Sequence, residues 1–117
     1  MTSKLVEIVV DCADAERLAE FWCAVLGWRV VDRDEGAVEI AGDDGGPTLL
    51  FDPVPDGKVV KNRVHLDLRA RDGDQQAEVE RVIALGATPV DIGQGDVSWV
   101  VLADPDGNEF CVLRGSP

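Results

Sequence analysis

The sequence has no apolar run that approaches the roughly 20 residues required by a membrane-spanning helix. Its first residues, MTSKLVEIVVDCADAE, reach acidic side chains before the apolar core of a signal peptide develops. Basic residues are also scarce: 11 Lys and Arg stand against 23 Asp and Glu. The resulting net charge of −12 repels phosphate backbones and anionic membrane surfaces. We therefore expect a cytoplasmic protein with no nucleic acid and no membrane as partner.

Cysteine and histidine are few. The chain has three cysteines, Cys12, Cys23 and Cys111, and a single histidine, His65. The odd number of cysteines follows no disulfide framework, so we expect reduced thiols and no disulfide-stapled fold. The 117 residues fit one domain over residues 1–117, and 45% of them are hydrophobic, which is enough for a core.

The first half of the chain predicts a strand followed by a helix. LVEIVV, residues 5–10, alternates between apolar and polar positions as a strand does. Asp14 can cap the start of the helix, and Gly27 lies where a left-handed C-cap is expected. The buried face of this helix is predicted from the helical spacing of Leu18, Phe21, Trp22, Val25 and Leu26.

The second half repeats this pattern. RVHLDLR, residues 63–69, alternates in the same way, Asp74 can cap a second helix, and Gly86 can end it. Glu7 then corresponds to His65 with about one residue of slip between the halves. Such self-similarity indicates an internal duplication.

Three short strands are predicted after each helix, separated by turn residues. They cover residues 28–32, 37–41 and 48–52 in the first half, and 88–92, 97–103 and 109–113 in the second.

The fold class is therefore α+β, with two tandem β-α-β-β-β modules. Module one covers about residues 3–53, a linker without periodicity covers 53–61, and module two covers about 62–114. A half of this size is near the lower limit for an independent core. We expect the modules to pack into one curved, cup-shaped mixed sheet with the helices on its outer face.

These features resemble the vicinal oxygen chelate superfamily, the group of glyoxalase I, bleomycin-resistance proteins and extradiol dioxygenases, and in particular its glyoxalase-like domain branch. The resemblance is carried by the duplicated plan and by DCADAERLAEFWCAVLGW, KNRVHLDLRA and VSWVVLADPDGNEFCVL, and it spans about residues 3–114. It implies a cup that holds a divalent metal on the first and last strands of each module. The corresponding positions are Glu7, His65, Leu50 or its neighbour, and Cys111, which depart from the family's usual His and Glu ligands.

Strand alternation places His65 on the cup face, together with Arg63, Asp67 and Arg69. A lone histidine is either a satisfied polar residue or a group that contacts a ligand, and one imidazole with one carboxylate leaves a catalytic metal short of its usual three protein ligands. Arg63 and Asp67 are candidate ligand-binding residues because they share this face.

Glu7 and Cys111 are the other candidates for chemistry. Glu7 lies in an apolar strand, where it is a solvated residue, a salt-bridge partner of Arg63 or Arg69, or a general base or metal ligand. Cys111 is a small buried hydrophobe or a thiolate that completes a metal set with Glu7 and His65.

Trp99 either packs in the core or forms a stacking wall of the cup. The expected function is that of a glyoxalase-like domain acting on a small organic molecule. As an enzyme it would use a divalent metal (zinc, nickel, manganese or iron) in lyase, isomerase or dioxygenase chemistry, with Glu7 and His65 as catalytic residues. The alternative is a metal-free binding protein of the bleomycin-resistance type, whose acidic cup would suit cationic compounds. The resemblance also implies a homodimer.

Overall fold

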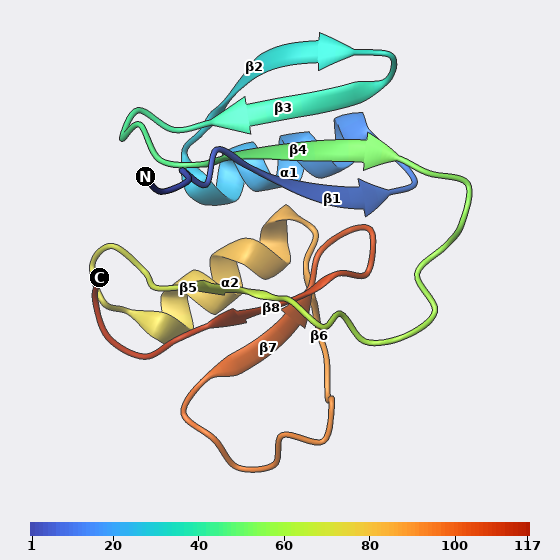
Figure 1. Cartoon of the computed structure of the whole chain (residues 1–117). Coiled ribbons are helices and arrows are strands. Elements are labelled where there is room, and N and C mark those ends of the chain that lie inside the picture. Colours follow the sequence, from blue (N-terminus) through green and yellow to red (C-terminus); the bar gives the residue numbers. More distant parts are fainter. The chain divides into compact units, whose positions relative to one another are not determined.

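The computed structural model describes all 117 residues. The chain divides into two compact units, Met1–Gly57 and Lys58–Pro117, and the boundary falls within the segment that the sequence marks as a linker. Each unit contains one helix and one four-stranded sheet (Figure 1). Neither helix is long and apolar enough to cross a bilayer. The units are described one at a time below.

Unit 1 has the order β-α-β-β-β. Its elements are β1 (Glu7–Cys12), α1 (Ala15–Leu26), β2 (Arg29–Asp34), β3 (Ala37–Ala41) and β4 (Thr48–Pro53). The strands lie in the order β1-β4-β3-β2, with β1 parallel to β4 and the other pairs antiparallel. The sheet is therefore mixed, as predicted.

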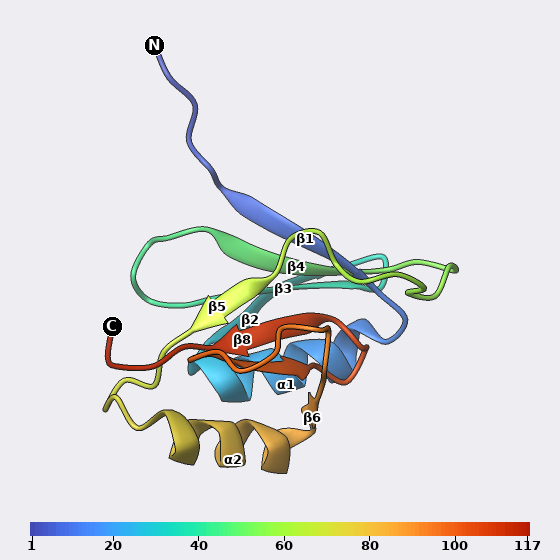
Figure 2. The ribbon, with the colours of Figure 1, turned by 90° about the horizontal axis from the view of Figure 1, so that it is seen from below.

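Local sequence explains why α1 forms where it does. The Asp14 carboxylate accepts a hydrogen bond from the Arg17 backbone N–H at 3.1 Å, which satisfies one donor of the first helical turn. Gly27 ends the helix at φ +70°, and its N–H donates to the Cys23 carbonyl. Both predicted caps are confirmed. The apolar face covers one side of the sheet (Figure 2), where it buries Leu18, Phe21, Trp22 and Val25.

Unit 2 follows the same order with shorter strands. Its elements are β5 (Leu66–Leu68), α2 (Gln75–Leu85), β6 (Thr88–Pro89), β7 (Val100–Ala103) and β8 (Glu109–Val112). The strands lie in the order β5-β8-β7-β6, and β5 is parallel to β8. Helix α2 starts at Asp74, whose carboxylate accepts from the Ala77 N–H, and ends at Gly86, as predicted. The β-α-β-β-β prediction is thus confirmed for both modules.

Three strands of unit 2 are clearly shorter in the structure than predicted. The alternating segment 63–69 is strand only over Leu66–Leu68. The segment 88–92 forms only the two-residue strand β6, and 97–103 becomes strand only from Val100. Proline at position 89 has no N–H for a sheet ladder. Beyond it, Asp91 and Gln94 side chains accept hydrogen bonds from the backbone N–H groups of Gly93 and Ile92, so local turns replace the ladder.

Candidate functional site

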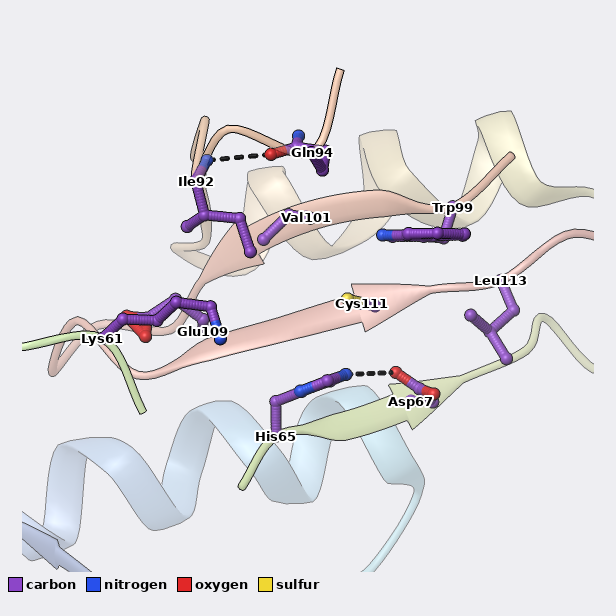
Figure 3. A pocket seen from close by; sticks show the side chains of 10 residues that line it. All are labelled: Lys61, His65, Asp67, Ile92, Gln94, Trp99, Val101, Glu109, Cys111 and Leu113. Atoms are coloured by element: carbon purple, nitrogen blue, oxygen red, sulfur yellow. Dashed lines mark hydrogen bonds and ion pairs between the residues drawn. The ribbon is translucent and has the colours of Figure 1, made fainter. Parts of the chain in front are cut away.

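A pocket of about 310 Å³ opens in unit 2 (Figure 3). Strands β5, β7 and β8 supply one part of its wall, and the linker and the loop before β7 supply the rest. The lining residues are Lys61, His65, Asp67, Ile92, Gln94, Trp99, Val101, Glu109, Cys111 and Leu113.

Sheet register brings the polar lining residues together. Cys111 in β8 pairs with Asp67 in β5 on one side and with Val101 in β7 on the other. Side chains directly opposite each other on neighbouring strands point to the same face. The intervening residues, such as Phe110 and Val112, are fully buried. One face of β8 therefore serves the core and the other serves the pocket.

His65, Asp67 and Cys111 form the chemical centre of this pocket. One ligand atom of each lies within 4.8 Å of the others. The imidazole Nε2 and the Asp67 Oδ1 are 3.1 Å apart (Figure 3). The side chains of His65 and Asp67 are 43% and 47% exposed, whereas Cys111 is only 4% exposed. Two accessible polar groups thus stand beside one buried sulfur atom.

The surroundings of the Cys111 thiol raise its pKa and so favour its protonated form. Burial raises its pKa, and the negative charge of Asp67 and a hydrogen bond to that carboxylate raise it further, against a smaller lowering by Lys61. Asp67 contacts both the Cys111 thiol and the His65 imidazole, so the hydrogen-bonding partner of the thiol is a carboxylate and not the imidazole. A nucleophilic triad needs the imidazole beside the thiol as its base. The arrangement therefore does not favour Cys111 as a nucleophile.

The cluster does fit a divalent metal. It offers a sulfur, a nitrogen and an oxygen donor, which is the number of protein ligands in a typical catalytic zinc site with one open position. Bond lengths of about 2.0–2.3 Å place the ligands of a tetrahedral zinc roughly 3.5 Å apart. A cluster already within 4.8 Å therefore needs a contraction of about 1.3 Å at most.

Glu109 also faces the pocket, but both of its carboxylate oxygens already have partners. Its side chain is 8% exposed; Oε2 lies 2.5 Å from Lys58 Nζ, and Oε1 accepts the Asn62 backbone N–H at 2.7 Å. Burial raises the pKa of Glu109, but the hydrogen bonds from Lys58 and Asn62 and the charges of Lys58 and Lys61 outweigh it and lower the pKa overall. These contacts tie the linker to β8.

Trp99 lies on the pocket wall and not in the core. The residue is 41% exposed, and its indole is seen edge-on in Figure 3, at the same end of the pocket as Leu113. Ile92 and Val101 extend this apolar wall. The wall offers a flat surface against which a planar molecule can pack.

Other predicted site residues lie outside this pocket. Arg63 is exposed and is not among the lining residues. Glu7 and Leu50 belong to unit 1, where Glu7 pairs with Thr48 and Leu50 lies between Val9 and Glu39. The role of Glu7 as a ligand alongside His65 thus stays a prediction from the sequence.

Some lining residues were not among the predicted site residues. Strand alternation places Glu109 on the same face as Cys111, two residues away, but no chemical role was predicted for it. Lys61, Ile92 and Gln94 lie outside regular strands, where no periodicity signals direction.

Comparison with known proteins gives a family for the whole chain. A family model described as "Glyoxalase-like domain" matches residues 7–113. No curated protein matches. Several solved structures share the fold. A glyoxalase/bleomycin resistance protein/dioxygenase family enzyme from Burkholderia phytofirmans is 17% identical, with a TM-score of 0.75 over 94% of this chain and 97% of that one.

Two fosfomycin resistance proteins are similar to the same degree. FosX from Mesorhizobium loti is 18% identical, with a TM-score of 0.73 over 99% of this chain and 95% of that one. A mutant of FosX from Listeria monocytogenes, in complex with Mn(II) and dihydroxypropylphosphonic acid, is 17% identical, with a TM-score of 0.73 over 99% and 93% of the chains. The matched family model, which covers nearly all of both units, establishes that this chain belongs to the glyoxalase-like domain family of the vicinal oxygen chelate superfamily.

Proposed function

We propose that unit 2 binds a small organic molecule beside a divalent metal held by His65, Asp67 and Cys111. The observation that carries this proposal is the convergence of three different donor atoms within 4.8 Å on the wall of a 310 Å³ pocket. That volume is at the lower end of the range for small-molecule sites. The ligand is therefore small.

The donor set favours zinc over manganese. A thiolate is a soft ligand that selects zinc, whereas manganese prefers carboxylate and water oxygens. The FosX complex from Listeria monocytogenes contains Mn(II), but that chain is only 17% identical to this one, and here a cysteine lies in the cluster. A bound zinc would supply Lewis-acid polarisation of a carbonyl or of vicinal oxygens, which suits lyase or isomerase chemistry, whereas dioxygenase chemistry would need a redox-active metal such as iron in its place.

The chain's own residues then have separate tasks. With a metal bound, the Cys111 thiol would lose its proton to become a ligand, and Asp67, no longer hydrogen-bonded to that thiol, would offer a carboxylate oxygen to the metal beside the His65 imidazole. Trp99 and Leu113 cover the apolar side of the pocket and limit water beside the ligand. We also propose, from the family resemblance, a cytoplasmic homodimer.

A metal-free binding protein of the antibiotic-sequestering type is the second candidate. It is favoured by the contacts within the cluster, because the thiol, carboxylate and imidazole already satisfy one another. A pocket with that internal bonding and an apolar wall can hold a ligand without any metal. The two proposed functions differ in the state of Cys111, which is a thiolate in the metal site and a thiol in the metal-free binding protein.

Cobalt titration of the purified full-length protein separates the candidates. Co²⁺ replaces zinc in such sites, and a thiolate ligand gives a sulfur-to-cobalt charge-transfer band in the near-ultraviolet. We expect one Co²⁺ per chain with this band, its loss in Cys111→Ser, and its retention in Cys23→Ser, a matched change in unit 1. Elemental analysis of the native protein should show one zinc.

Two results would overturn the metal site. One is a protein that takes up no metal after reconstitution, which favours the binding protein. The other is a charge-transfer band that survives in Cys111→Ser. The single histidine provides an independent readout, because only one imidazole signal set can shift in NMR spectra on metal addition.

A further inference from the structure

We infer that the ligand of the unit 2 pocket is a small planar anion, an aromatic or conjugated carboxylate, with its ring against Trp99 and its negative charge toward Lys61. This inference rests on the proposed function, because it names the ligand class of the same pocket. It departs from the cationic ligand that the overall charge of −12 suggests.

The charges lining the pocket are not acidic on balance. Glu109 forms an ion pair with the adjacent Lys58 at 2.5 Å, whereas Asp67 keeps its negative charge and makes its contacts with His65 and the Cys111 thiol inside the cluster. Lys61 also lines the pocket, but its ammonium donates only to the Asn62 carbonyl at 3.2 Å and has no carboxylate partner. The lining therefore offers one cation that is not held in an ion pair, and one carboxylate, Asp67, whose contacts lie within the His65–Asp67–Cys111 cluster.

The shape of the pocket restricts the rest of the ligand. Trp99, Ile92, Val101 and Leu113 form an apolar wall, and Figure 3 shows Lys61 toward one end of the pocket and Trp99 with Leu113 toward the other. A ligand that uses both ends has an apolar flat body and an anionic group. A cation at the Lys61 end of the pocket would meet like charge.

Three probes of nearly equal size and shape test the charge preference: benzoate, benzamide and benzamidine, which are anionic, neutral and cationic near neutral pH. The full-length protein is titrated with each in the presence of a chelator, so that no metal can bind the carboxylate. The readout is the indole N–H signal of Trp99 in NMR spectra. The chain has three tryptophans, so Trp99→Phe identifies that signal by its loss.

We expect the Trp99 signal to shift with all binding probes and benzoate to bind about fivefold more tightly than benzamide, with benzamidine weakest. Lys61→Met should remove the preference for benzoate and leave benzamide unchanged. Arg71→Met, which removes an exposed cation of unit 2 outside the pocket lining, is the matched control and should retain the preference.

Equal affinity for the three probes, tighter binding of benzamidine, or no binding of benzoate would overturn this inference. So would a preference that survives in Lys61→Met or disappears in Arg71→Met. The cobalt titration is independent of these probes. A protein that binds Co²⁺ through Cys111 but ignores benzoate refutes the ligand class alone, whereas one that binds benzoate but no metal refutes the metal site alone.

Discussion

The two units share one order of elements, but corresponding positions carry different chemistry. In unit 2 the row across the sheet is Asp67, Cys111 and Val101. In unit 1 the matching row is Val9, Leu50 and Glu39, with no sulfur or imidazole. A duplicated fold therefore keeps its core pattern in both copies while the residues on the open face diverge.

The burial of side chains within each unit differs as well, and it is greater in unit 1, which lacks the donor cluster. In α1, six residues are buried, whereas in α2 only Val82 is buried. The strands of unit 1 are five or six residues long, and those of unit 2 are four or fewer. The unit with the better-packed helix lacks the pocket chemistry. Stability and chemistry are thus concentrated in different copies of the same pattern.

The largest effect should come from the core of unit 1. Leu18→Ala removes a fully buried side chain of α1 and should lower the free energy of unfolding by about 3 kcal/mol. Val82→Ala in α2 removes a smaller side chain and should cost about 2 kcal/mol. Urea unfolding followed by circular dichroism measures both, with Glu20→Ala on the exposed side of α1 as a control that stays within about 0.5 kcal/mol.

If Val82→Ala lowers the free energy of unfolding as much as Leu18→Ala does, or more, the inferred difference in packing between α1 and α2 is wrong. They would mean that α2 is anchored as firmly as α1 despite its single buried residue. A change in the urea dependence of the Leu18→Ala transition would point to loss of cooperativity and would require a separate analysis of each unit.

Zinc affinity should depend on pH through unit 2 alone. The pKa of the Cys111 thiol is raised from its ordinary value of 9.0, so metal binding at neutral pH must displace a proton. The association constant should therefore rise by about tenfold for each pH unit between about pH 7 and pH 8.5. Competition with a chelator of known affinity measures this dependence, after correction for protonation of the chelator.

Calorimetry in buffers of different ionisation enthalpy should then show about one proton released per zinc. Cys23→Ser in unit 1 should retain that release, although burial also raises the pKa of the Cys23 thiol. A flat pH dependence would show that Cys111 is not a ligand.

Much of the fold could be predicted because its signals are local. The spacing of apolar residues, Asp14 before α1 and Asp74 before α2 each depend on neighbours within a few positions, and the structure confirms both caps. The predicted lengths of strands 88–92 and 97–103 were less accurate. Their lengths depend on which partner strand continues to pair, and Pro89 and the turn at Gly93 interrupt that pairing.

The site was only partly predictable for a similar reason. Alternation alone assigned His65 and Asp67 to one face. The approach of Asp67 to Cys111 depends on the register between β5 and β8, which are 44 positions apart in their paired residues and have no shared local signal. Lys61 precedes the strand, where no periodicity reveals the direction of a side chain.

A pH-dependent effect on stability is expected from the ion pair and hydrogen bond that join the linker region to β8 through Glu109. The pKa of Glu109 is raised by burial, but Lys58 and Asn62 outweigh burial and lower it overall. A lowered pKa in the folded state means that the stabilisation is complete above the unfolded pKa of about 4.3 and is lost as pH falls through the lower folded value. Glu109→Gln should therefore cost about 2 kcal/mol at pH 7 and progressively less toward pH 3.

The matching position of unit 1 provides the control for that change. Thr48 precedes Leu50 as Glu109 precedes Cys111, and its hydroxyl donates to the Glu39 carboxylate at 2.7 Å without any cation in the contact. Thr48→Val should cost about 1 kcal/mol and leave the acid dependence of unfolding largely intact. Urea unfolding of both variants at pH 3, 5 and 7 measures this difference. If Glu109→Gln lowers the free energy of unfolding by the same amount at pH 3, 5 and 7, the carboxylate charge does not stabilise the contact between the linker and β8. Packing of the Glu109 side chain would then account for that contact.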